Sequence, residues 1–79
     1  MKELIIHIVQ ALVDNPEEIQ VNEIKGGNTK VYELMVAKKD LGKVIGKQGR
    51  NINAVRTILT AASATAEKGQ SILQLIEEM

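Results

Sequence analysis

The 79-residue sequence lacks cysteine, tryptophan and phenylalanine, and it contains one tyrosine, Tyr32, and one proline, Pro16. Without cysteine, neither a disulfide bond nor a thiolate metal site can reinforce the fold. RRM, OB and cold-shock modules stack bases on aromatic side chains, so a single tyrosine excludes those modes of nucleic-acid binding. Apolar residues still make up 44% of the chain, which predicts a compact core.

Long apolar runs are also absent, and no stretch approaches the roughly 20 apolar residues that span a bilayer. The apolar N-terminal stretch is interrupted by His7 and Gln10 and has no small-residue cleavage site, which does not match a signal peptide. We therefore expect a cytoplasmic protein with no membrane partner. The acids Asp14, Glu17 and Glu18 are typical of a solvated turn. No pattern of histidine, serine or acidic residues predicts a metal, a cofactor or a catalytic site.

The formal net charge is zero, but the charges are unevenly distributed along the sequence. Residues 38–56 carry six bases and one acid, a formal charge of +5, and the rest of the chain carries −5. A concentrated basic segment in an otherwise acidic chain attracts an anion to one place. A merely solvated basic surface is the alternative, and it is disfavoured because the bases gather around two glycines.

Hydrophobic periodicity and turn residues divide the chain into six elements of a single domain, residues 1–79. Proline ends the first helix, Gly26-Gly27-Asn28 forms a hairpin turn, and Gly69 ends the last helix. The final segment fits a strand or a helix by pattern, and we interpret it as a strand because a two-stranded hairpin needs a third partner. The predicted elements are a helix at 2–14, strands at 19–25 and 29–37, helices at 40–45 and 51–68, and a strand at 71–78. This α-β-β-α-α-β order predicts an α+β fold with helices packed on one face of a three-stranded sheet.

The spacing of apolar residues also predicts which faces are buried. In the second strand, alternation places Tyr32, Leu34 and Val36 on one face. Asp40 is the candidate N-cap of the short helix. In the first helix the predicted core face consists of Leu4, Ile5, Ile8, Ala11 and Leu12. In the long helix it consists of Ile52, Val55, either Ile58 or Leu59, Ala62 and Ala66.

The most informative stretch is the loop Gly46-Lys47-Gln48-Gly49 between the two central helices. Glycine has no Cβ, so a polyanion backbone can approach closely. The loop feeds the N-terminus of the long helix, whose free N–H groups and positive dipole end favour phosphate. The neighbouring Lys43 and Arg50 add positive charge. A Walker A loop is excluded, because the spacing from Gly42 is too short and Gln48 replaces the Ser/Thr that would hold magnesium.

The run from Leu41 to Ile52, Leu-Gly-Lys-Val-Ile-Gly-Lys-Gln-Gly-Arg-Asn-Ile, resembles the signature of KH domains. The element order, with the motif between the two central helices, is similar to that of a type II KH domain over essentially the whole chain. The resemblance is closest to the small free-standing bacterial KH proteins of the KhpA type. It implies a non-enzymatic protein that clamps about four nucleotides of single-stranded RNA against the glycine loop.

The resemblance also assigns roles to particular residues. Gly46 and Gly49 would form the loop that supports the RNA backbone, and Ile45 and Ile52 would floor a groove for the bases. Val36 and Val55 would extend that floor. The residues expected to contact phosphates are Lys43, Lys47, Gln48 and Arg50, and two further basic candidates are Lys39 and Arg56. The implied role is that of an RNA chaperone or post-transcriptional regulator.

A second class of function is suggested by residues 57–66, which carry no charge. Surface helices usually carry Lys and Glu on their outer face, so small uncharged residues all round indicate a second covered face. The alternative is a bland exposed Ala/Ser/Thr face. The KhpA resemblance implies a homodimer, or a heterodimer with another KH protein. In this alternative the chain would serve as a protein-interaction module. If the ligand is a nucleic acid, the sequence does not decide between RNA and single-stranded DNA.

Overall fold

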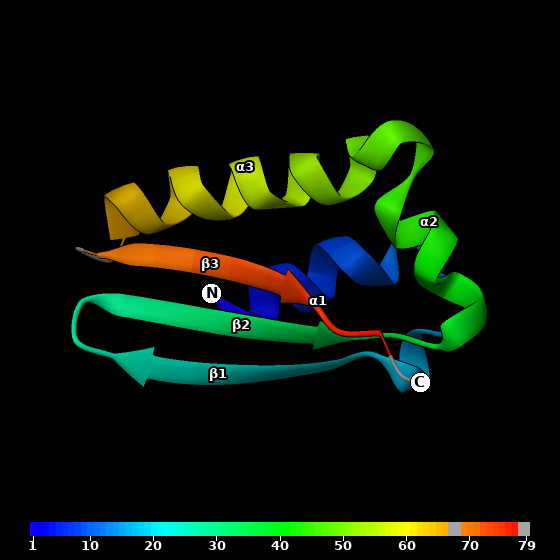
Figure 1. Cartoon of the computed structure of the whole chain (residues 1–79), viewed down its shortest axis with the longest axis horizontal. Helices are drawn as coiled ribbons and strands as arrows, with labels where there is room; N and C mark the ends of the chain where they lie inside the picture. Colours follow the sequence, from blue (N-terminus) through cyan, green and yellow to red (C-terminus); the bar gives the residue numbers. More distant parts are fainter. Residues whose placement is uncertain (67–68, 78–79) are drawn as a thin grey trace.

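The computed structural model describes residues 1–66 and 69–77, which form three α-helices and a three-stranded sheet (Figure 1). Their order confirms the predicted α-β-β-α-α-β sequence and the choice of a strand for the C-terminal segment, but this strand ends at Leu75, before the predicted end at residue 78. Short 3₁₀ turns lie at Pro16–Glu18, Lys38–Asp40 and Lys47–Gly49. The larger elements are α1 (Lys2–Gln10), β1 (Gln20–Gly26), β2 (Thr29–Met35), α2 (Leu41–Ile45), α3 (Arg50–Ala66) and β3 (Gln70–Leu75).

The sheet has the order β1-β2-β3, with β2 in the centre. β1 pairs antiparallel to β2 through the predicted hairpin turn, in which Gly27 has a φ of +59°. β3 pairs parallel to β2 on the other side, so the chain between them must cross from one end of the sheet to the other. That crossover contains α2 and α3, and it places the glycine loop at one end of the molecule (Figure 1).

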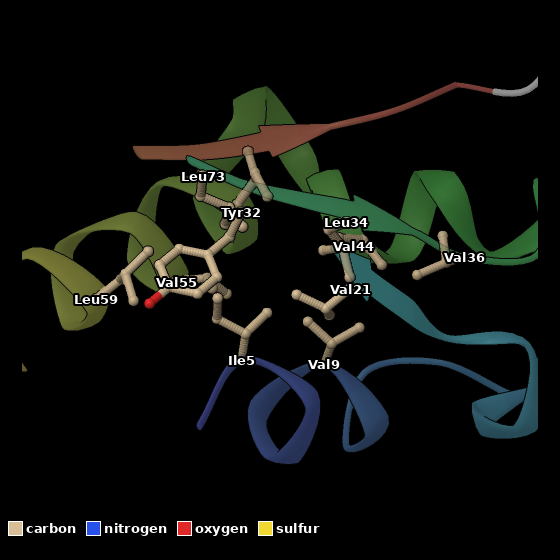
Figure 2. Packing of buried hydrophobic residues seen from close by; sticks show 11 residues of the cluster. Ile5, Val9, Val21, Tyr32, Leu34, Val36, Val44, Val55, Leu59 and Leu73 are labelled. Atoms are coloured by element: carbon tan, nitrogen blue, oxygen red, sulfur yellow. The ribbon is translucent and has the colours of Figure 1, made fainter. Parts of the chain in front are cut away.

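The core lies between one face of the sheet and the helices. Alternation along β2 buries Tyr32 and Leu34, and both side chains are fully inaccessible. Figure 2 shows these two side chains pointing towards the helices, with Tyr32 near Ile5 of α1 and Leu59 of α3. The remaining members of the core come from the helices, from the two outer strands and from the connection after β2. They are Val9, Val21, Val36, Val44, Ile52, Val55 and Leu73.

The opposite face of the sheet is open. Ile24 of β1 and Ile72 of β3 lie in register with Val31 of β2, and they are 50% and 42% exposed. The helices therefore cover one face only, as predicted.

α1 ends at Gln10, four residues before the predicted end, and the prediction of a helix to Asp14 is wrong. The backbone N–H groups of Asp14 and Asn15 bond to the carboxylate of Asp40 instead of continuing a helical ladder. The buried residues of α1 are Ile5 and Val9. Of the other predicted core residues, Leu4, Ile8 and Leu12 are partly buried and Ala11 is exposed.

α3 settles the choice between Ile58 and Leu59. Leu59 is 2% exposed and belongs to the core, whereas Ile58 is 44% exposed. Ser63 is the buried residue one turn further on, and its hydroxyl bonds to the Ser71 hydroxyl of β3 at 2.6 Å. Ala62 is only partly buried, and the side chain of Ala66 lies outside the described residues.

Two further predictions need correction. Asp40 precedes α2 but makes no side-chain cap bond to it, because its carboxylate bonds to residues 14 and 15. β2 ends at Met35 rather than at residue 37. The predicted end of the long helix at residue 68 lies outside the described residues, so the role of Gly69 as a helix stop stays a prediction. A Cβ at Gly69 would lie 2.4 Å from the carbonyl oxygen of Asn28, which excludes any side chain there.

Candidate nucleic-acid interface

The loop Gly46–Gly49 joins the C-terminus of α2 to the N-terminus of α3 in a conformation that only glycine adopts easily. Gly46 has φ +73° and ψ 177°, a region that is essentially restricted to glycine. Gly49 has a φ of +74°, and between the two glycines Gln48 adopts a left-handed conformation with φ +56° and ψ 27°. Three residues with positive φ within four positions turn the chain sharply and expose the side chains of Lys47 and Gln48.

Asn51, in the first turn of α3, braces this turn. Its side-chain Nδ2 donates to the backbone carbonyl of Lys43 at 2.8 Å, which links the two helices on either side of the loop. A Cβ at Gly46 would lie 2.7 Å from Cγ of Asn51 and 3.0 Å from its backbone nitrogen. Gly46 is therefore required both by its dihedral angles and by the space that Asn51 occupies.

The loop opens beside the N-terminus of a 17-residue helix. The first N–H groups of a helix have no intrahelical partner, and they lie at the positive end of its dipole. Lys47 and Arg50 have exposed side chains at this end of the molecule. Positive charge, peptide N–H groups and close backbone access therefore coincide at one place, which is the arrangement that binds a phosphate.

Lys43 lies in α2 next to this cluster, but it is not a free cation. Its ammonium group forms an ion pair with the carboxylate of Asp14, which comes from the connection between α1 and β1. The bond to Asp14 raises the pKa of Lys43 above its ordinary value, and although partial burial opposes this, the charge of Asp40 acts in the same direction. Asp14 remains largely exposed, as expected for a turn acid, but its pairing with Lys43 could not be predicted from the sequence.

Asp40 is 1% exposed and accepts three hydrogen bonds from the α1–β1 connection. The donors are the backbone N–H of Asp14 at 3.3 Å, the backbone N–H of Asn15 at 3.0 Å and Nδ2 of Asn15 at 3.1 Å. Burial alone would raise the pKa of Asp40, but these bonds and the nearby charge of Lys43 outweigh it and hold the pKa below its ordinary value. Asp40 is thus an ionised anchor that fixes the connection against the start of α2.

The apolar residues expected to floor a groove belong mostly to the core. Val36 is 7% exposed, Ile52 6% and Val55 2%, so each presents little surface to a ligand, whereas Ile45 is partly buried. A shallow groove of about 190 Å³ lies instead between α3 and the edge strand β3. It is lined by Arg56, Leu59, Thr60, Ser71, Ile72 and Leu73.

Arg56 extends across that groove. Its Nε donates to the backbone carbonyl of Leu73 at 3.4 Å, and its Nη1 lies 3.5 Å from Oδ1 of Asn53. The structure therefore separates the basic candidates: Arg56 lies at the groove, and Lys39 is exposed in the turn before α2. Sequence reasoning missed Thr60, Ile72 and Leu73 as groove residues. The strand assignment of the C-terminal segment could have suggested them, because an edge strand beside α3 must present such residues.

Within residues 1–66 and 69–77, no group of three or more His, Asp or Glu side chains could hold a metal ion. None of the helices formed by these residues is long and apolar enough to cross a membrane.

Comparison with known proteins places the chain in a family. A family model described as KhpA/KhpB, KH domain, matches residues 2–75. The chain belongs to the KhpA/KhpB KH-domain family. The type II KH resemblance drawn from the sequence is confirmed by this match and by the α-β-β-α-α-β order.

Individual KhpA proteins match the chain almost from end to end. The chain is 49% identical over 78 residues to the RNA-binding protein KhpA of Chlamydia trachomatis, covering 99% of each chain. It is 51% identical over 76 residues to the RNA-binding protein KhpA of Caldanaerobacter subterraneus, covering 96% of this chain and 100% of that protein. The KhpA of Clostridium perfringens is 46% identical over the same length and coverage. These names describe RNA-binding proteins, which are not a class of enzyme.

Proposed function

We propose that the chain is a non-catalytic KH domain that binds single-stranded RNA, with the RNA backbone resting on Gly46–Gly49. The observation that carries this proposal is the backbone of the loop, where two glycines with positive φ expose Lys47 and Gln48 at the N-terminus of α3. Close backbone approach and peptide N–H groups suit a phosphodiester. The KhpA relatives are named as RNA-binding proteins, which supports RNA as the ligand class.

From the loop, the single-stranded RNA runs along the groove between α3 and β3. Arg56 lies seven residues beyond Gly49 on α3, which corresponds to about 10 Å along the helix axis. That distance suits the few nucleotides that a KH domain holds. The bases would contact aliphatic groups of the exposed groove residues Thr60 and Ile72, because no aromatic platform is present on this side of the described residues. Ile45 and the exposed edges of Ile52, Val55 and Val36 would contribute only at its margin.

Phosphate contacts are assigned to Lys47, Gln48 and Arg50 and to Lys43 when a phosphate replaces its partner Asp14, with Lys39 at the periphery. Few contacts and aliphatic packing give modest affinity and modest base discrimination, which suits an RNA chaperone or post-transcriptional regulator acting in the cytoplasm on many transcripts.

A second function, pairing with another KH chain, is favoured by one observation. A shallow apolar hollow between α1 and α3 is lined by Ile8, Leu12, Ala54 and Ile58 together with parts of Asn51 and Val55. Ile58 is 44% exposed at its rim, on the helix segment that carries no charge. A homodimer, or a heterodimer with another KH protein, would cover this surface.

The RNA proposal is tested with the double variant Lys47→Asp, Gln48→Asp. Both glycines remain, and aspartate tolerates the left-handed conformation at position 48 better than most residues, so the loop should keep its shape. The matched control is Lys2→Asp, Gln10→Asp, which makes the same change of charge at two exposed positions of α1. Binding of a labelled single-stranded RNA pool and of DNA of matched composition is followed by fluorescence anisotropy.

We expect the loop variant to lose RNA binding and the control to retain it within about twofold, since exposed charges far from the site act weakly. Equal loss in both variants would mean that only the overall charge matters. Retention in both would remove the loop as the phosphate site. Equal binding of RNA and DNA would keep the loop but widen the ligand to any single strand.

A further inference from the structure

We propose that Asp14 is an electrostatic brake on the RNA-binding loop: its carboxylate holds the ammonium group of Lys43 and so lowers the attraction of the loop for phosphate. The inference rests on the proposed RNA-binding function and adds to it a residue, remote in sequence, that sets the affinity.

The first step is the position of Lys43. Its backbone carbonyl accepts a hydrogen bond from Asn51, the residue that braces the loop, so Lys43 is fixed at the base of the site. With Lys47 and Arg50 it would give the site a formal charge of +3. The ion pair with Asp14 reduces this set to +2.

The second step is that Asp14 is held where it is. Its backbone N–H, and both the backbone and the side chain of Asn15, bond to the buried carboxylate of Asp40. Asp40 in turn lies three residues before Lys43, at the start of α2. The anchor fixes the backbone of the α1–β1 connection, so the Asp14 carboxylate meets Lys43 at little cost in conformational entropy.

The third step is the strength of the pair. Lys43 and Asp14 have side chains that are 48% and 71% exposed, so water and salt screen their attraction. Exposed pairs of this kind are weak, and a phosphate can replace the carboxylate. Asp14 therefore weakens binding without blocking it, as a brake requires.

The test uses Asp14→Asn, with Asp14→Ser as a second way of removing the charge. The control Glu17→Gln removes one exposed acid from the same connection. Lys43→Gln and the double variant Asp14→Asn, Lys43→Gln complete a double-mutant cycle. The probe is a short labelled single-stranded RNA pool, titrated at several salt concentrations, and thermal melting followed by circular dichroism checks folding.

We expect both Asp14 variants to bind about two- to fivefold more tightly than wild type at low salt, as the release of one exposed ion pair permits. Their salt dependence should steepen by about 0.7 in the slope of log K against log salt, the value for one added phosphate contact on a single strand. The gain should vanish in the double variant, and Glu17→Gln should bind as wild type does.

Unchanged affinity and slope in folded Asp14 variants would overturn the brake and leave RNA binding by the loop intact. An equal gain in Glu17→Gln, or a gain that persists without Lys43, would also overturn it, because the effect would then come from the overall charge. If neither the wild type nor any variant binds RNA, the proposed RNA-binding function fails, and the proposed effect of Asp14 fails with it.

Discussion

Gly42 and Gly46 lie four residues apart in one run of sequence, yet they meet opposite structural demands. A Cβ at Gly46 would enter a glycine-only backbone region and meet Asn51, whereas a Cβ at Gly42 would meet nothing within 4 Å. We expect Gly46→Ala to lower the free energy of unfolding by about 1–3 kcal/mol and to weaken RNA binding. Gly42→Ala, within α2, should raise it by up to about 1 kcal/mol. Urea unfolding and RNA titration of both variants check this, and equal effects would contradict it.

The lowered pKa of the Asp40 carboxyl predicts that the stability of the fold depends on pH. Its hydrogen bonds hold its pKa below the ordinary value of 3.8, so the unfolded chain takes up the proton first as the pH falls. The contribution of Asp40 to folding is therefore fully present above about pH 4 and is lost as the pH falls through its lower value in the folded protein. Asp40→Asn should lower the Tm by several degrees at neutral pH, because a carboxylate that accepts three bonds is replaced by a weaker acceptor.

The measurement is thermal melting of wild type and Asp40→Asn from neutral to acidic pH. The gap in Tm should narrow below the ordinary pKa, since a protonated Asp40 resembles the amide. Glu17 is an exposed acid in the neighbouring connection, so the Tm of Glu17→Gln should differ from that of wild type by a small amount that does not change with pH. A gap for Asp40→Asn that stays constant to acid pH would show that its carboxylate is not the ionised anchor.

At this scale the sequence predicted the loop glycines and missed the roles of Asp14 and Asp40. The two glycines, Gly46 and Gly49, could be recognised from local chemistry, because they lack a Cβ and easily adopt the positive φ of a short loop between two helices. The position of Asp40 before α2 is typical of an N-cap, and local pattern favours that role. The competing partners lie about 25 positions away in sequence, and only the folded chain brings them to the carboxylate.

At the scale of elements, α3 illustrates what periodicity leaves open. Ile58 and Leu59 fit the apolar pattern equally well in the sequence, but only Leu59 packs against the sheet. We expect Leu59→Ala to lower the free energy of unfolding by about 2–5 kcal/mol through loss of a fully buried side chain. Ile58→Ala should cost less than about 1 kcal/mol, because nearly half of its side chain is already in water.

Urea unfolding of both variants at one low protein concentration measures the difference. Similar costs for the two substitutions would mean that the core face of α3 is rotated from the one described. A domain of this size has a free energy of unfolding at the low end of the usual range of about 5–15 kcal/mol. The Leu59→Ala variant should therefore begin to unfold at a low urea concentration.

Element types were predictable, and their boundaries were less so. Alternation in β2, the hairpin turn and the need for a third strand all followed from residues close together in sequence. The early end of α1 could not be predicted in this way, because apolar residues continue to Leu12 and Val13 at helical spacing. The chain leaves the helix there to reach Asp40, a tertiary contact that outweighs local propensity.

At the scale of the whole molecule, the net charge is zero, but the surface has a basic region at the loop and an uncharged region at Ile58. Exposed basic groups surround the loop, and Ile58, from the uncharged part of α3, lies at a hollow formed with α1. The sequence predicted both the basic segment and the uncharged one. It could not predict that Ile58 stands over a hollow formed with Ile8, since the two residues are 50 positions apart.

If that surface pairs two chains, each dimer presents two loops, and a long RNA strand gains from binding both. Ile58→Lys places a charge on the surface and should give a monomer whose Tm does not depend on protein concentration. Its affinity for an RNA long enough to reach two loops should fall about tenfold or more, whereas its affinity for a strand that fits one loop should not change. Ile24→Lys makes the same substitution at an isoleucine that is 50% exposed on the open face of the sheet, and it should behave as wild type. Sedimentation of the three proteins, combined with titration of short and long RNA, separates pairing from RNA contact. A wild type that sediments as a monomer at all concentrations would exclude the pairing and leave the loop as the functional surface of a single chain.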